Sequence, residues 1–128
     1  MLRRLREGRA LPAAGHDALL RERPRVQAAL AAELGLALAV LPTAPHVAPE
    51  IAPLERDDDV FMAANTRTLR ATLATSFLDM PGVSLPIGPA EDGLPAGLLL
   101  TGPSGGDDRV LLAALRAEAA LTGAGRAR

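Results

Sequence analysis

The apolar residues of this chain are almost all aliphatic, which limits the kind of core it can build. Apolar residues make up 48% of the 128 positions, but aromatic residues make up only 2%, with no Trp and no Tyr. Side chains of Ala, Leu, Val and Ile bury less area each than the aromatic residues that anchor most cores and interfaces. A chain of this length forms one domain at most. We therefore expect one segment, residues 1–128, whose thin core is stabilised by packing against another structure.

Charge and cysteine content exclude several classes of function. The fourteen basic residues are all Arg, and with fifteen acidic residues they give a net charge of −1. This balance argues against binding to nucleic acid or to acidic membranes. The absence of Cys excludes disulfides and thiolate metal sites, and no apolar run approaches the roughly 20 residues of a membrane span. We expect a cytoplasmic protein that binds neither nucleic acid nor membrane.

The first third of the chain carries two helical patterns and one strand pattern. High charge and sparse apolar residues indicate a solvated helix over residues 2–9. Leu and Val at helical spacing predict a second helix over residues 16–34, which Pro24 either kinks or splits. The apolar run 36–42 then predicts a short buried strand that ends at Pro42.

The middle of the chain predicts an extended loop, a helix and a hairpin. Four prolines between residues 42 and 53 favour an extended surface loop. An Asp within residues 57–59 is expected to cap a helix that continues to about Thr75. Two short runs, residues 83–87 and 96–101, flank a loop rich in Pro and Gly, which is the pattern of a β-hairpin.

The last helix is expected over residues 107–121, followed by a disordered tail over residues 122–128. Together these patterns predict a mixed α/β fold with about three short strands, two of them in the hairpin, and three to four helices.

The loop before the last helix looks at first like a phosphate-binding loop. It contains Gly102, Gly105 and Gly106 between a strand pattern and a helix pattern. A P-loop, however, needs Gly and then Lys at the positions that Asp107 and Asp108 occupy here, and two carboxylates repel a phosphate. We interpret the glycines as a turn, with Asp107 or Asp108 capping the helix.

No metal-binding or cofactor-binding pattern stands out in the sequence. His16 lies in a predicted helix and His46 in the proline loop, and neither belongs to a known ligand spacing. The acidic run 57–59 lacks the alternating pattern of a calcium loop. We therefore expect no metal and no cofactor. His46 stays a candidate for lining a pocket, because a loop histidine beside an extended run is well placed to do so.

The sequence offers no catalytic nucleophile either. Its serines are Ser76, Ser84 and Ser104, none lies in a G-x-S-x-G elbow, and no Lys is present to activate one. We expect no catalytic residue in this chain.

Several motifs, taken in order, resemble the C-terminal part of the amidase signature family. They are "LPTAPHVAPEIAPL", "NTRTLRATLATSFLDMPGVSLPIG" and "GLPAGLLLTGPSGGDDRVLLAALRAEAAL", and "LREGRALPAAGHDALLRER" is similar to the helical stretch before them. The resemblance implies the C-terminal part of that family's mixed sheet and a hydrolase of carboxamide C–N bonds. It also implies that the Ser, cis-Ser and Lys of the reaction lie upstream, outside the matching region. Whether the chain is an enzyme is left open.

The resemblance leaves two interpretations of function open. In the first, the chain is the C-terminal fragment of an amidase, inactive alone, whose partners are a complementing amidase segment and a small amide substrate. Thr43, His46, Asn65 and Ser76 are then expected to line the substrate pocket, although the family often has Asn where this chain has Ser76. In the second, it is a noncatalytic module that forms a homo-oligomer or binds a partner through exposed strand edges.

Overall fold

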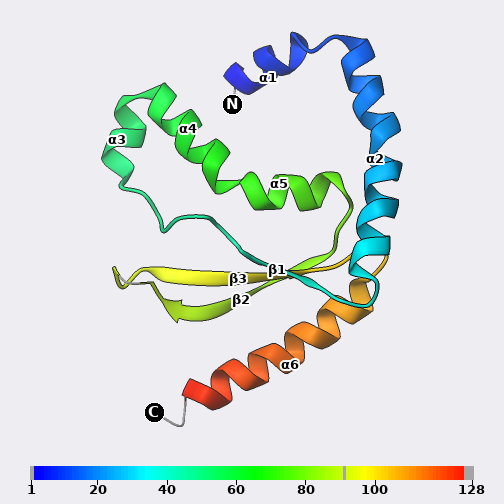
Figure 1. Cartoon of the computed structure of the whole chain (residues 1–128). Coiled ribbons are helices and arrows are strands. Elements are labelled where there is room, and N and C mark those ends of the chain that lie inside the picture. The colour runs from blue at the N-terminus through cyan, green and yellow to red at the C-terminus, as the bar shows by residue number, and fades with distance from the viewer. Residues whose placement is uncertain (1, 91, 126–128) are drawn as a thin grey trace.

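The computed structural model describes residues 2–90 and 92–125 and shows a mixed α/β fold (Figure 1). The helices are α1 (Leu2–Arg9), α2 (Ala13–Leu34), α3 (Ile51–Arg56), α4 (Asp58–Thr68), α5 (Arg70–Phe77) and α6 (Asp107–Gly125). The strands are β1 (Ala39–Pro42), β2 (Gly82–Pro89) and β3 (Pro95–Thr101). The predicted fold class and its β-hairpin are confirmed, and the helical residues fall into more segments than the three to four expected.

The strands form one antiparallel sheet in the order β1-β3-β2. The hairpin pairs β2 with β3, and β1 pairs with the other edge of β3, so that β3 lies in the middle. Helix α6 lies on one side of the sheet, and helices α4 and α5 lie on the other (Figure 1). Two distant parts of the chain, β1 and the β2–β3 hairpin, therefore meet along β3.

The core is small and aliphatic. Among the described residues, the buried apolar side chains are Leu85, Leu99, Leu100, Val110 and Ala114. Leu85, Leu100 and Ala114 form one cluster in which α6 packs on the hairpin. All of these residues belong to β2, β3 or α6, so the long helix α2 contributes no buried side chain to the core. This distribution agrees with the thin core expected from the composition.

The middle of the chain contains a helix where its prolines predict an extended loop. Helix α3 lies inside the segment for which an extended loop is expected, and Pro53 occupies its third position. Proline is tolerated in the first turn of a helix because the N–H it lacks has no helical partner there. Pro24 lies well beyond the first turn of α2, and the helix continues through it without splitting. The expected helix through Thr75 is divided at Leu69 into α4 and α5.

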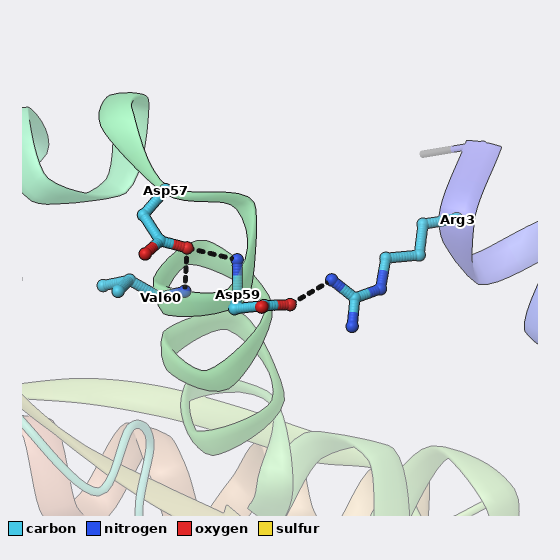
Figure 2. Close-up of polar contacts among 4 residues, drawn as sticks. All are labelled: Arg3, Asp57, Asp59 and Val60. Carbon is cyan, nitrogen blue, oxygen red and sulfur yellow. Dashed lines mark hydrogen bonds and ion pairs between the residues drawn. The ribbon is translucent and has the colours of Figure 1, made fainter.

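The capping residue of α4 is Asp57. Its carboxylate accepts hydrogen bonds from the N–H groups of Asp59, at 2.8 Å, and Val60, at 3.2 Å (Figure 2). These bonds satisfy two of the N–H groups that a helix leaves free at its start. The carboxylate of Asp59 points away from the cap toward Arg3 on α1, with which it forms an ion pair of 2.5 Å (Figure 2).

The glycine loop after β3 forms the predicted turn. Gly105 adopts a φ of 77°, a conformation that favours glycine, and the Gly106 N–H bonds the Pro103 carbonyl at 3.0 Å. The Gly106 carbonyl accepts the bond from Val110 N–H, so Gly106 is the N-cap residue of α6. The prediction that Asp107 or Asp108 caps this helix is wrong, because both lie in its first turn. Helix α6 continues beyond the expected end at 121, and the predicted disordered tail falls partly on residues 126–128, which lie outside the described residues.

Candidate functional site

A cavity lies where the end of β1 faces the middle of the hairpin. It has a volume of about 940 Å³ and is lined by β1, by the proline loop that follows it, and by the facing parts of β2 and β3. Thr43, His46, Ser84 and Gly97 are among its lining residues. Most of the others are Val, Leu, Ile, Ala or Pro, and none of the described residues that line it is Asp, Glu or Arg. The cavity is therefore an apolar space with a few neutral polar groups.

Two hydroxyl groups meet at Gly97, in the central strand. The Oγ1 of Thr43 lies 2.6 Å from the Oγ of Ser84. The backbone brings Thr43 there, because its N–H donates to the carbonyl of Gly97 at 2.9 Å and so extends the pairing of β1 with β3. A Cβ on residue 97 would lie 2.8 Å from Thr43 Oγ1 and 3.0 Å from Ser84 Oγ. Glycine at this position is thus what allows the two hydroxyls to meet.

The imidazole of His46 turns toward helix α4. Its Nδ1 lies 2.7 Å from the Val47 carbonyl oxygen, which only accepts, so Nδ1 carries the hydrogen of this bond. In the neutral ring Nε2 is then an acceptor, and it lies 3.0 Å from the Thr68 hydroxyl. That hydroxyl also lies 2.8 Å from the Ala64 carbonyl, so its single hydrogen is shared between two acceptors. The Nδ1 bond therefore holds the ring within the proline loop, and the Nε2 bond joins that loop to α4.

The structure brings together only two of the four residues expected to line a substrate pocket. Thr43 and His46 both line the cavity. Asn65 is half-buried on α4 and Ser76 is exposed on α5, and neither belongs to the cavity lining. Contact of these two residues with a substrate stays a prediction.

The cavity residues do not form a nucleophile activated by a base. Ser84 is bonded to another hydroxyl, and the nitrogens of His46 are bonded to Val47 and Thr68. Within residues 2–90 and 92–125, no group of three or more His, Cys, Asp or Glu side chains is placed to hold a metal ion. What the arrangement offers chemically is recognition by hydrogen bonds in an apolar space.

Sequence reasoning missed the roles of Ser84 and Gly97. In the sequence, Ser84 is one of three serines and Gly97 is one residue of a predicted strand. A glycine inside a strand often marks a place where other groups approach the backbone closely. That signal was present in the sequence, but the identity of the two approaching side chains depends on the strand order.

These features define an α/β segment in which three strands contribute to a pocket lined by no Asp, Glu or Arg among the described residues. The model of the Amidase family matches residues 3–111, and the chain belongs to that family. It is 32% identical over 97 residues to the 6-aminohexanoate-cyclic-dimer hydrolase of Paenarthrobacter ureafaciens, covering 70% of this chain and 20% of that protein. A protein of the same name from Pseudomonas sp. (strain NK87) is also 32% identical over 97 residues, with 70% of this chain and 20% of that protein covered.

A third relative comes from Wolinella succinogenes and forms part of its glutamyl-tRNA(Gln) amidotransferase. The identity is 34% over 84 residues, covering 66% of this chain and 18% of that protein. The chain thus spans about a fifth of the length of the curated relatives that it matches. No solved structure matches it. Among the described residues, no helix combines the length and the apolar character that crossing a membrane requires.

Proposed function

We propose that this chain forms part of an amidase-type hydrolase acting on carboxamide C–N bonds, and that it has no turnover alone. Membership of the Amidase family carries the reaction type. The sequence contains no Lys, and the hydroxyl of Ser84 is bonded to Thr43 rather than to a base. The nucleophile and its base are therefore supplied by another segment, and this chain supplies one wall of the substrate pocket.

The exposed surface supports a chain that packs against another structure. Its accessible surface is 9458 Å². A compact monomer of 13.2 kDa exposes only roughly 6400 Å². Large apolar side chains are exposed on helices as well as strands, among them Leu115 at 65% and Val40 at 56%. We propose that its partner is a complementing amidase segment in the cytoplasm.

The second candidate function is a noncatalytic module that associates with itself or with a partner. It is favoured by the same exposed surface and by strand β1, which pairs along one edge only. An exposed strand edge is a template for pairing with another chain. The two candidates differ in whether amide hydrolysis appears when the chain is completed.

A chimera tests the proposal. The full chain, with helix α6 intact, replaces the matching segment of the 6-aminohexanoate-cyclic-dimer hydrolase of Paenarthrobacter ureafaciens, and hydrolysis of that enzyme's own substrate is measured beside the enzyme lacking the segment. The proposal predicts activity in the chimera and none in the truncated enzyme or in this chain alone. A folded, soluble chimera without hydrolysis would favour the noncatalytic module.

A further inference from the structure

We propose that the paired hydroxyls of Thr43 and Ser84, together with Gly97, form a subsite for a neutral amide that presents its C=O and an N–H on the same edge. Primary carboxamides and lactam-like cis amides have such an edge, whereas trans secondary amides carry the two groups on opposite edges. The inference deepens the proposed function, on which its role in substrate selection rests. The binding itself needs no catalytic residue.

The hydroxyl pair keeps hydrogen-bond groups free for a ligand. Each hydroxyl has one hydrogen and two lone pairs, and the 2.6 Å bond between Thr43 and Ser84 uses one hydrogen and one lone pair. The pair keeps one O–H to donate and lone pairs to accept. An amide edge uses both, because its carbonyl accepts the free O–H and its N–H donates to the other oxygen. The three bonds then close into a ring in which every donor has an acceptor.

The spacing of the two hydroxyl oxygens matches the edge of an amide. The oxygen and nitrogen of one amide are about 2.2 Å apart, as follows from the lengths of the C=O and C–N bonds. The two hydroxyl oxygens are 2.6 Å apart, so both can reach the same amide edge with nearly parallel hydrogen bonds. Gly97 keeps the space beside the pair free of a side chain, since a Cβ there would lie within 3.0 Å of both oxygens.

The described residues of the cavity lining offer no charge to compensate that of an ionic ligand. Thr43 is half-buried and Ser84 is exposed, so an ionised carboxylate or ammonium bound at the pair would lose part of its hydration against the apolar lining and would need an opposite charge in return. The described lining residues include no Asp, Glu or Arg, and the ring nitrogens of His46 are bonded to Val47 and Thr68. The cavity therefore favours an uncharged ligand whose body is apolar.

Binding of small amides to the full chain tests this subsite. The ¹⁵N-labelled chain is titrated at low temperature with hexanamide, hexanoate, hexylammonium and N-methylhexanamide, and NMR shifts of the N–H groups of Thr43, Ser84 and Gly97 are followed. We expect saturable, millimolar binding of hexanamide at these groups and, by rough estimate, about 10-fold weaker binding of the other three compounds. Equal binding of hexanamide and N-methylhexanamide would contradict recognition of a same-edge amide.

Three variants separate the hydroxyl pair from general effects. Ser84→Ala and Thr43→Val each remove one hydroxyl and are expected to raise the Kd of hexanamide by about 2- to 10-fold. Ser104→Ala removes a hydroxyl from the exposed turn after β3, outside the cavity, and is the matched control that should leave the Kd unchanged. An unchanged Kd in both hydroxyl variants overturns the subsite. So does a spectrum without the dispersed resonances of a sheet, because the pair exists only when β3 lies between β1 and β2.

The outcomes for the subsite and for the proposed function are distinguishable. Hydrolysis by the chimera without hexanamide binding to the chain would remove the subsite and leave the function. Specific hexanamide binding without hydrolysis by a folded chimera would leave the subsite and remove the function.

Discussion

Arg23 Nη2 lies 2.5 Å from Asp79 Oδ1, and this ion pair fastens the long helix α2 to the turn between α5 and β2. The same guanidinium donates through Nε to the Phe77 carbonyl and lies 5.7 Å from the centre of the Phe77 ring. Gln27, one turn further along α2, donates to the Leu78 carbonyl at 2.9 Å. Since α2 has no buried side chain, these contacts are a main part of what holds it in place.

Removing the Arg23 side chain is therefore expected to destabilise the chain. We predict that Arg23→Ala lowers the free energy of unfolding by about 1–2 kcal/mol, because an ion pair, a hydrogen bond and a cation–π contact are lost together. Arg25→Ala is the matched control, since Arg25 pairs only within its own helix, with Glu22, and its side chain is 78% exposed. Urea unfolding measures both. Equal losses in the two variants would contradict this role of Arg23.

The substitution of Gly by Ala is expected to have opposite effects on stability at two positions, Gly102 and Gly15. A Cβ on Gly102 would lie 2.9 Å from Leu38 Cδ2 and 3.1 Å from Val110 Cγ2, where α6 packs beside the sheet. We expect Gly102→Ala to destabilise the chain by about 1–3 kcal/mol through overpacking. Gly15 lies in α2 with only Leu11 Cδ1 near, at 3.8 Å, so Gly15→Ala is expected to stabilise by about 0.5–1 kcal/mol. Thermal melting measures the stability of both variants. A stabilising effect of Gly102→Ala would show that α6 does not pack in this way.

The cap of α4 gives a third prediction. Asp57→Ala removes the acceptor of two backbone N–H groups and is expected to cost about 1 kcal/mol, with faster hydrogen exchange in the first turn of α4. Asp58 lies in the same first turn, where its charge favours the helix dipole but where the cap bonds belong to Asp57, so Asp58→Ala is expected to cost roughly 0.5 kcal/mol. Equal exchange rates in the two variants would argue against Asp57 as the cap.

Much of the fold follows from local patterns in the sequence. The spacing of apolar residues predicted helices that became α2 and α6, and the Pro- and Gly-rich loop predicted the β2–β3 hairpin. The errors have local causes as well. Helix α3 contains Pro53 in its first turn, where proline is tolerated, and the break at Leu69 comes from one residue with ψ of 0° that no Gly or Pro announces.

The site was less predictable than the fold. The proline loop suggested Thr43 and His46 as pocket residues, and both line the cavity. Ser84 was not expected there, because its bond to Thr43 joins residues 41 positions apart through a strand order that no local pattern reveals. The nitrogens of His46 proved to be bonded to Val47 and Thr68, which only the tertiary structure shows.

The exposed apolar surface predicts how the isolated chain behaves. An accessible surface of 9458 Å² on so small a core should give a broad, weakly cooperative thermal transition and association at high concentration. Circular dichroism melting and analytical sedimentation measure the two properties. A sharp transition in a dimer of defined size would instead favour the self-associating module.

Release of product from amides measures the central claim most directly. The purified chain, the chimera that carries it and the truncated relative are compared under identical conditions. We expect hydrolysis by the chimera alone and no turnover by the isolated chain after repurification. Appreciable hydrolysis of simple amides by the isolated chain, retained through repurification and lost in Ser84→Ala, would contradict this expectation.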